Sequence, residues 1–233
     1  MTENRNIVIV TGAAGFIGSA LIRRLSETMS VIGLDLFAPK AMPAHATFAQ
    51  IDLSSDDSVR QVLRTIRAQH GARIASVIHL AAYFDMTGEP SSKYESITVR
   101  GTERLLRELR QFELEQFVFA SSMLAHKAGR PGDLINEDWP LESNLPYRTS
   151  KIKTEHLIHA LRGAIPVVHM RPAGIYDDQC RNPFLAQQIA RIYEEDPKGH
   201  VYPGDLRTGQ SFLHLDDLTD GELEQLLRSE EGE

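Results

Sequence analysis

Apolar and polar residues follow one another along this chain in two alternating periods. A β-branched apolar run, Ile7 to Val10, is followed by apolar residues at helical spacing, which are Ala20, Leu21, Ile22 and Leu25. The same succession of a short apolar run and a longer amphipathic stretch continues to about residue 170. This order predicts βαβ units, and therefore an α/β fold with a doubly wound parallel sheet and helices on both faces.

The pattern also predicts where the elements lie. Further strands are expected at 31–36, 47–51, 74–80, 117–120 and 165–170, and further helices at 56–69, 94–110 and 147–161. Beyond residue 171 the pattern loosens, with several prolines around one helical segment, 183–195. We therefore expect a main domain over residues 1–176 and a small, incomplete substrate-binding lobe over residues 177–233.

Three glycines lie between the first strand and the first helix, in the stretch TGAAGFIG. Gly12, Gly15 and Gly18 are spaced one residue wider at the start than the G-x-G-x-x-G dinucleotide fingerprint. In that fingerprint one glycine allows a tight turn, one lets a pyrophosphate approach the backbone, and one lets the helix pack closely on the sheet. Free N–H groups at the start of the helix favour a phosphate. The alternative is a glycine-rich turn that binds nothing.

A carboxylate ends the second expected strand, where a dinucleotide would place its adenosine ribose. Asp35 follows the glycines by about twenty residues, the usual separation for an acid that binds the ribose hydroxyls. It would repel a 2′-phosphate, so it favours NAD over NADP. Asp52 follows the third expected strand and could contact adenine. Each has a structural alternative, because Asp35 can cap a turn and Asp52 can cap a helix.

The stretch YRTSK places a phenol and an ammonium on one face of a helix, because Tyr147 and Lys151 are four residues apart. An ammonium beside a phenol favours the phenolate, so we expect a lowered pKa for Tyr147 and a role in acid-base catalysis. Ser122 follows the fifth expected strand, at the sheet edge where open α/β proteins bind ligands. Its hydroxyl would hold a substrate oxygen while Tyr147 transfers a proton.

The composition is that of an ordinary globular protein. The 233 residues are 42% hydrophobic and carry a formal net charge of −7, which argues against a nucleic-acid surface. The sequence contains no apolar run of about eighteen residues, and residues 1–6 are too few and too polar for a signal peptide. Cys180 is the only cysteine, which excludes an internal disulfide and a cysteine-based metal site. We expect a cytoplasmic protein with a small-molecule substrate, without a metal, and without nucleic-acid or membrane partners.

Several motifs occur in an order that resembles the extended short-chain dehydrogenase/reductases, also described as the NAD-dependent epimerase/dehydratase family. They are TGAAGFIG, Asp35, IDL at 51–53, HLAA at 79–82, SSM at 121–123, YRTSK, RPAGIY at 171–176 and FLHLDDL at 212–218. The resemblance covers residues 6–218 and implies a Rossmann-like sheet, bound NAD(P) and a Ser/Tyr/Lys active site.

Carried over by position, the resemblance assigns roles to individual residues. Ser122 would bind the substrate oxygen, Tyr147 would be the acid-base group, and Lys151 would hold the nicotinamide ribose. The residues implied at the cofactor are Gly12, Gly15, Phe16, Ile17, Gly18, Asp35, Asp52, Leu53, Leu80, Ala81, Ala82, Tyr83, Tyr147, Lys151 and Pro172.

The departures from the family pattern bear on the substrate. Members that dehydrate nucleotide sugars have an Asp-Glu pair where residues 123–124 are Met-Leu here, which disfavours a dehydratase. Gly174 and Gln210 replace an asparagine and an arginine that serve the nucleotide diphosphate. Arg181 or Arg207 would have to substitute, so a nucleotide sugar is not the default substrate.

Compared with the family pattern, the chain is expected to be shortened at its C-terminus, because only TDGELEQLLRSEEGE follows FLHLDDL. An uncovered sheet edge or apolar helix face invites pairing, so we expect that a homodimer can form. The sequence predicts an oxidoreductase that transfers hydride between a secondary alcohol or carbonyl and NAD, with Tyr147 as the acid-base group. Two alternatives stay open: a nucleotide-sugar epimerase and a catalytically silent NAD-binding module.

Overall fold

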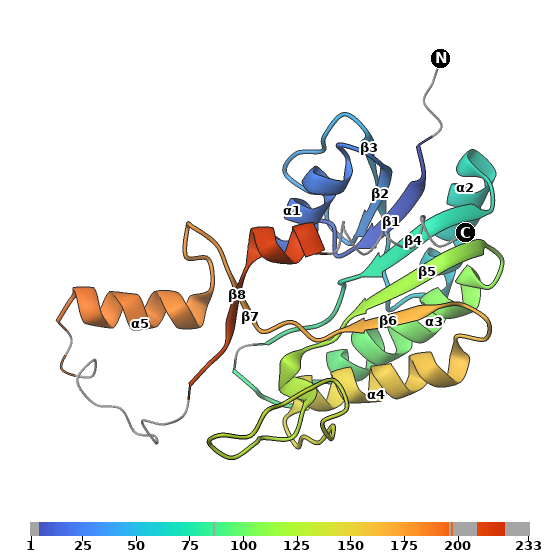
Figure 1. The fold of residues 1–233 in the computed structure, drawn as a ribbon. Helices are drawn as coiled ribbons and strands as arrows, with labels where there is room; N and C mark the ends of the chain where they lie inside the picture. The colour runs from blue at the N-terminus through green and yellow to red at the C-terminus, as the bar shows by residue number, and fades with distance from the viewer. Residues whose placement is uncertain (1–4, 86, 196, 198–208, 222–233) are drawn as a thin grey trace.

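A six-stranded parallel sheet forms the centre of the protein in the computed structural model, which describes residues 5–85, 87–195, 197 and 209–221 (Figure 1). The strand order β3-β2-β1-β4-β5-β6 shows that the chain starts in the middle and winds to one edge before the other. Each neighbouring pair is parallel, so the carboxyl ends of the strands share one edge. The strands are β1 (Ile7–Thr11), β2 (Ser30–Asp35), β3 (Ala46–Gln50), β4 (Arg73–His79), β5 (Glu113–Ala120) and β6 (Val167–Met170).

Helices cover both faces of the sheet, as the sequence pattern predicts (Figure 1). Alternate residues of β1 explain the two layers, because Val8 and Val10 pack in one apolar cluster and Ile9 in the other. The first cluster includes α1 (Phe16–Leu25), and the second includes α2 (Asp56–His70), α3 (Arg100–Leu109) and α4 (Pro146–Leu161). The predicted doubly wound α/β fold is confirmed.

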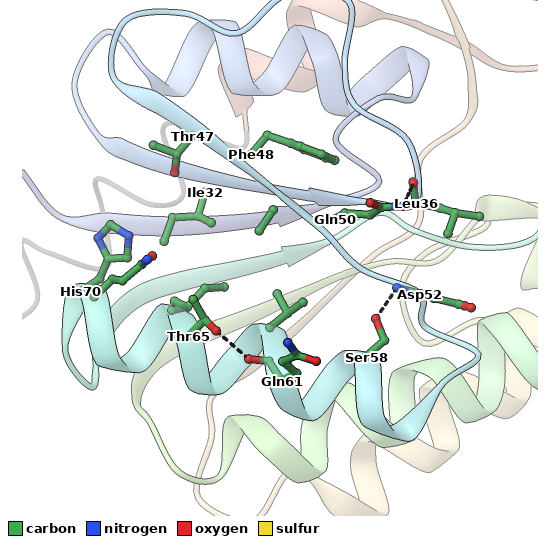
Figure 2. Close-up of a pocket in the computed structure, with 14 residues that line it drawn as sticks. Ile32, Leu36, Thr47, Phe48, Gln50, Asp52, Ser58, Gln61, Thr65 and His70 are labelled. Carbon is green, nitrogen blue, oxygen red and sulfur yellow. Dashed lines mark hydrogen bonds between the residues drawn. The ribbon is translucent and has the colours of Figure 1, made fainter.

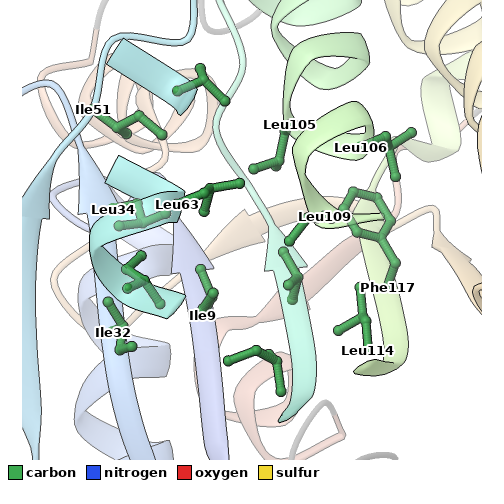
Figure 3. Packing of buried hydrophobic residues seen from close by; sticks show 14 of the residues in the cluster. Ile9, Ile32, Leu34, Ile51, Leu63, Leu105, Leu106, Leu109, Leu114 and Phe117 are labelled. Atoms are coloured by element: carbon green, nitrogen blue, oxygen red, sulfur yellow. The ribbon is translucent and has the colours of Figure 1, made fainter. Parts of the chain in front are cut away.

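The larger of the two clusters lies between the sheet and the helices α2 and α3 (Figure 3). Ile9 and Phe117 of the sheet and Leu105 of α3 are completely buried in it. Burying a side chain of this size contributes about 1.5–3 kcal/mol. The cluster therefore fixes the strands, and with them the loops that leave their carboxyl ends.

Two elements differ from the sequence prediction. β5 begins at Glu113, four residues before the predicted start at Phe117. The sequence pattern does not show these residues as a strand, because Glu113 and Glu115 are exposed and interrupt its apolar run. Tyr94–Val99 is π-helical, and α3 starts only after it, where one continuous α-helix was expected. Hydrophobic periodicity does not separate a π-turn from an α-helix, and π-helical turns are frequent at functional sites.

Beyond residue 171 the chain forms a second, two-stranded sheet in which β7 (Gly174–Tyr176) runs parallel to β8 (Phe212–His214). α5 (Pro183–Tyr193) lies between them in the sequence, and residues 215–221 are helical. The sequence predicted α5 but not the two strands, because a strand of three residues is too short to show a periodicity. The domain boundary after residue 176 stays a prediction.

Candidate functional site

A cavity of about 600 Å³ lies at the carboxyl ends of the parallel strands and reaches β7 and the start of α5. Ligands bind at this edge in open α/β folds. Residues from the glycine turn, from the loops after β2, β3, β4 and β5, and from α4 line it together. The predicted site residues in its lining are Gly12, Gly15, Phe16, Ile17, Gly18, Asp35, Asp52, Leu53, Leu80, Ala81, Ala82, Ser122, Tyr147 and Pro172.

The glycines of the turn have separate steric reasons. Gly12 has a φ of +76°, a conformation that L side chains rarely adopt. A Cβ on Gly18 would lie 2.0 Å from the carbonyl oxygen of Gly12, and a Cβ on Gly15 would lie 3.1 Å from the same oxygen. Gly12 therefore makes the tight turn, and Gly18 allows the helix to pack against it.

Helix α1 begins at this turn without a side-chain cap for its first backbone N–H groups. Its N-cap residue is Gly15, which has no side chain to cap the helix, and the sequence of its first turn contains no acid. α2 and α5, by contrast, begin at Ser55 and Asn182, whose side chains accept from the first N–H groups. Since residues 15–18 line the cavity, α1 presents backbone donors and the positive end of its dipole there. This arrangement fits the pyrophosphate of a dinucleotide.

Two carboxylates lie near the glycine turn. Asp35 accepts hydrogen bonds from the backbone N–H of Ala14 at 3.0 Å and of Phe37 at 3.3 Å. Asp52 accepts from the backbone N–H of Ser54 at 2.8 Å and from its hydroxyl at 2.6 Å. Asp35 thus has the turn-stabilising role given above as its alternative. Asp52 closes the turn at 52–54 instead of capping α2, whose N-cap is Ser55. Both carboxylates also line the cavity. A carboxylate offers about four acceptor positions, so Asp35 retains capacity for ribose hydroxyls.

At the end of β4, His79 is buried between two threonines. Its Nδ1 lies 2.7 Å from Thr11 Oγ1, and its Nε2 lies 2.9 Å from Thr102 Oγ1. Thr102 donates its own proton to the carbonyl oxygen of Thr98, while Thr11 accepts from the N–H of Ala81. These directions place the imidazole proton on Nε2. Burial lowers the pKa of His79 to about 3, so the neutral ring ties β1, β4 and α3 together below the cavity.

The two candidate catalytic hydroxyls meet inside the cavity. Ser122 follows β5 and caps the turn of residues 123–125, where its Oγ accepts from the N–H of Leu124 at 3.2 Å. Tyr147, at the start of α4, lines the same cavity, and its phenol lies close enough to Ser122 for that side chain to lower its pKa. Phe84 packs edge-on against the ring of Tyr147, with 5.0 Å between the ring centroids. The phenol and the serine hydroxyl therefore converge on one point, as an acid-base pair acting on one substrate oxygen requires.

The acidity of Tyr147 corrects the sequence expectation. Burial raises the pKa of Tyr147 to about 12, and the nearby side chain of Ser122 offsets only part of this effect. The Nζ of Lys151 donates instead to the carbonyl oxygen of Ala120 at 2.6 Å and lies 5.7 Å from the centroid of the Tyr147 ring. The expected lowering of the Tyr147 pKa by Lys151 is therefore wrong in this geometry. Burial also lowers the pKa of Lys151 to about 8.

A buried ion pair supports the site from behind. Glu155, one helical turn after Lys151, accepts from Nε of Arg171 at 3.0 Å, from its Nη2 at 2.7 Å, and from the hydroxyl of Ser121. Arg171 also donates to the carbonyl oxygen of Glu137 at 2.9 Å. Burial raises the pKa of Glu155, but the hydrogen bonds from Arg171 and Ser121 outweigh it and leave the pKa below its ordinary value. Sequence reasoning missed this pair, because only the fold brings β6 to α4.

Two predicted residues are not among the described residues that line the cavity. The hydroxyl of Tyr83 donates to Asp85 at 3.1 Å, and its ring packs edge-on against Tyr94 at 4.9 Å between centroids. Lys151 is buried beneath the lining. Phe84, the residue after Tyr83, lines the cavity in its place. The resemblance pointed to Tyr83, and the path of the loop after β4 brings Phe84 to the cavity instead.

The lining also contains residues that were not selected from the sequence as site residues. Those at 123, 124, 174 and 210 are the departures from the family pattern described above. Ile51, Ala173 and Ile175 belong to the IDL and RPAGIY motifs, and the other residues belong to none of the quoted motifs. The residues are Leu34, Leu36, Ile51, Phe84, Ile97, Met123, Leu124, Ala173, Gly174, Ile175, Asn182, Pro183, Phe184, Gln210 and Ser211.

A second cavity, of about 440 Å³, lies between β3 and α2 (Figure 2). Asp52 is the one predicted site residue among the described residues that line it. Its backbone N–H is bonded there to the hydroxyl of Ser58 at 2.9 Å, and the side chain of Gln50 donates to the carbonyl oxygen of Leu36 at 3.1 Å. The predicted chemistry thus belongs to the larger cavity.

Two further observations concern only the part of the chain that the structure describes. Its histidine, cysteine and acidic side chains form no group of three or more that could hold a metal ion. None of its helices combines the length and the apolar character needed to cross a membrane.

The sequence of the chain is similar to that of several enzymes. It is 29% identical to a UDP-glucose 4-epimerase of Erwinia amylovora, over 94% of this chain and 73% of that protein. It is 30% identical to 3 beta-hydroxysteroid dehydrogenase type 7 of Mus musculus, over 94% of this chain and 64% of that protein. The chain therefore spans about two thirds to three quarters of the length of these relatives.

The fold and the family model agree with this similarity. A crystal structure of UDP-glucose 4-epimerase from Thermus thermophilus in complex with NAD superimposes with a TM-score of 0.76, at 25% identity, over 94% of this chain and 74% of that one. Residues 8–233 match the NAD dependent epimerase/dehydratase family. The family inferred from the motifs is thus confirmed, with NAD as its cofactor, and this chain belongs to the NAD dependent epimerase/dehydratase family of enzymes.

Proposed function

We propose that the protein is an NAD-dependent oxidoreductase that transfers hydride between the nicotinamide and a secondary alcohol or the corresponding carbonyl compound. The placement of Ser122 and Tyr147 together in the cavity that the glycine turn also lines carries this proposal. One hydroxyl would hold a substrate oxygen, and the other would exchange a proton with it. Relatives named as a hydroxysteroid dehydrogenase and as sugar epimerases support this type of reaction.

The residues around the glycine turn would hold the cofactor. The backbone N–H groups at the start of α1 would bind the pyrophosphate, and Asp35 would bind the hydroxyls of the adenosine ribose. Pro172 would approach the nicotinamide. Lys151 would hold the nicotinamide ribose after its Nζ turns from the carbonyl oxygen of Ala120 toward the cavity. NADP is less favoured, because Asp35 would repel its 2′-phosphate. When bound, NAD supplies the position that accepts or returns the hydride.

The proton is handled by the residues of this chain. In the reduction direction, Ser122 donates a hydrogen bond to the carbonyl oxygen, and Tyr147 transfers its phenolic proton to that oxygen as hydride reaches the carbon. A pKa of about 12 keeps the phenol protonated at neutral pH, so Tyr147 is ready to act as the acid. In the oxidation direction, the proton of the alcohol passes to the deprotonated phenol as hydride leaves the carbon. Because a pKa of about 12 makes this form scarce at neutral pH, oxidation needs a more alkaline pH than reduction.

The direct test follows NADH absorbance with a panel of secondary alcohols and ketones, for the wild type, Tyr147→Phe and Ser122→Ala. We expect kcat to fall by about 10²–10⁴-fold in each variant, while calorimetry shows that NAD binding is retained. Gly15→Val and Asp35→Ala test the cofactor site separately, because we expect the first to abolish NAD binding and the second to weaken it. Undiminished turnover by Tyr147→Phe would assign the proton transfer to another group.

A nucleotide-sugar epimerase is the second candidate, because UDP-glucose 4-epimerases are among the relatives. It would use Ser122 and Tyr147 twice, first to oxidise a carbon and then to reduce it from the opposite face. UDP-glucose would then give UDP-galactose without net formation of NADH. A catalytically silent module would instead bind NAD and convert no compound of the panel.

The remaining predictions concern the assembly and location of the protein. A homodimer is supported by the apolar surface of α5, where Ile192 is 73% and Tyr193 is 87% exposed. Light scattering would test it, since Ile192→Ser should shift a dimer toward the monomer. We also propose that the protein is cytoplasmic. We propose that the domain boundary follows residue 176, and limited proteolysis would test it by cleavage after that residue.

A further inference from the structure

We infer that the substrate is an apolar secondary alcohol or its ketone, whose carbon skeleton packs on Phe84, Leu124 and Phe184. The inference rests on the proposed function, because it assumes that the oxygen of this compound meets Ser122 and Tyr147. It concerns only the part of the cavity beyond these two hydroxyls.

The charges of the cavity argue against an anionic substrate. Among the described residues that line it there is neither lysine nor arginine, and the acids there are Asp35 and Asp52, both near the glycine turn. A nucleotide diphosphate bound beyond Tyr147 would bury its negative charges without an opposing cation among the described lining residues, which is costly. The described lining offers it uncharged groups instead, such as Gln210 and Ser211.

Arg181, one of the two arginines that could replace the missing diphosphate-binding arginine, already forms an ion pair with Asp177. Nε of Arg181 donates to Asp177 at 2.6 Å, and its guanidinium lies 4.7 Å from the centroid of the Phe16 ring. This places Arg181 beside the residue that follows the turn glycine Gly15, at the end of the cavity that contains α1. The other candidate, Arg207, lies outside the described residues.

Large apolar side chains surround the reacting hydroxyls and remain open to solvent. Phe84, Leu124 and Phe184 are 54%, 45% and 45% exposed, although each lines the cavity. They come from three separate segments, the loop after β4, the turn after Ser122 and the start of α5. Phe84 also contacts the ring of Tyr147 directly. Covering such surface with hydrocarbon is favourable by about 25 cal/mol per Å², so an apolar carbon skeleton would gain binding energy here.

The experiment compares substrates that share a ring hydroxyl and differ in charge. 4-tert-Butylcyclohexanol and pregnenolone are assayed by NADH formation, and UDP-glucose both by NADH and by UDP-galactose formation. We expect kcat/KM to be higher for an apolar alcohol than for UDP-glucose. Leu124→Asp should raise the KM for the apolar alcohol by about tenfold or more, the effect of losing roughly one buried apolar contact, without changing the Kd for NAD. Leu134→Asp is the matched control, because Leu134 is 89% exposed and lies outside the cavity lining.

The outcomes separate this inference from the proposed function. Preferred conversion of UDP-glucose, or a KM that Leu124→Asp leaves unchanged, would overturn the inference while the oxidoreductase chemistry stands. If no compound is converted, the proposed function fails, and binding of 4-tert-butylcyclohexanone and of UDP to the NADH-loaded protein decides the inference. Binding of the ketone that Leu124→Asp weakens and Leu134→Asp does not would support it. Binding of UDP alone, or of neither compound, would overturn it.

Discussion

The Nζ of Lys151 donates to the carbonyl oxygen of Ala120 at 2.6 Å, although Tyr147 is the residue that it was expected to activate. Lys151 is 3% exposed, and burial lowers its pKa to about 8 from an ordinary value of 10.5. The fold thus holds an ammonium where desolvation opposes its charge. Proteins accept such a cost at functional positions, where stability and activity make opposite demands.

Replacing this ammonium should therefore stabilise the protein and inactivate it. We expect Lys151→Met to be more stable than the wild type at pH 7 by about 1–3 kcal/mol, since a pKa unit corresponds to about 1.4 kcal/mol. Because the native pKa lies below the unfolded one, the native chain loses its proton first between pH 8 and 10.5, and wild-type stability rises with pH across that window. Urea unfolding at pH 7 and pH 10 checks this, because the advantage of Lys151→Met should shrink at the higher pH. A variant less stable than the wild type at pH 7 would contradict it.

The ion pair of Glu155 and Arg171 makes the opposite prediction. Glu155→Gln leaves the guanidinium of Arg171 without its buried counter-charge, so we expect a loss of about 2–3 kcal/mol of stability, below the range for fully buried pairs because Arg171 is partly exposed. Since the native pKa of Glu155 is lowered from 4.5, its contribution is present above that value and is lost as pH falls through the native pKa. Denaturant unfolding at pH 7 and pH 4 should show the difference narrowing. Glu113→Gln is the control, because Glu113 is exposed and should cost little at either pH.

The same variant tests whether the ion pair positions the active site. Glu155 holds Ser121, the residue before Ser122, and stands on the helix that carries Tyr147. We expect Glu155→Gln to lower kcat more than it raises KM, because the hydroxyls are displaced while the cavity lining is kept. Equal values of kcat for Glu155→Gln and the wild type would reduce its role to stability.

His79 gives a pH dependence of its own. Its pKa is about 3 in the native chain and near 6.5 when unfolded, so the unfolded chain binds a proton between these values that the native chain does not. The contribution of the neutral ring is complete above pH 6.5 and is lost as pH falls toward 3. We expect His79→Gln to be less stable than the wild type at pH 7, with a difference that narrows by pH 4.5. His45→Gln, at an exposed position, should show no such trend, and a constant difference for His79→Gln would contradict the assignment.

The fold could be predicted from the sequence because buried strands appear there as short apolar runs and amphipathic helices as apolar residues at helical spacing. Candidate site residues could be predicted only where a local pattern marks them. Ser122 follows the end of a strand, and Tyr147 and Lys151 are spaced one turn apart on one helix. The ion pair of Glu155 and Arg171 joins a helix to the residue that follows β6, and no local pattern links them. The high pKa of Tyr147 could not be predicted either, because the spacing in the sequence indicates the nearby ammonium but not the burial that raises the pKa.

The steric fit of the glycine turn gives the last prediction. A Cβ at position 18 would lie 2.0 Å from the carbonyl oxygen of Gly12, and backbone atoms cannot yield to it as a flexible side chain would. We expect Gly18→Ala to destabilise the protein by about 1–3 kcal/mol and to weaken NAD binding, because α1 must move away from the turn. Gly209→Ala is the control, since a Cβ there would meet no atom within 4 Å. Calorimetric titration with NAD and thermal unfolding of both variants check the prediction. If Gly18→Ala matched the control in stability and affinity, the close contact between helix and turn would not be what this glycine provides.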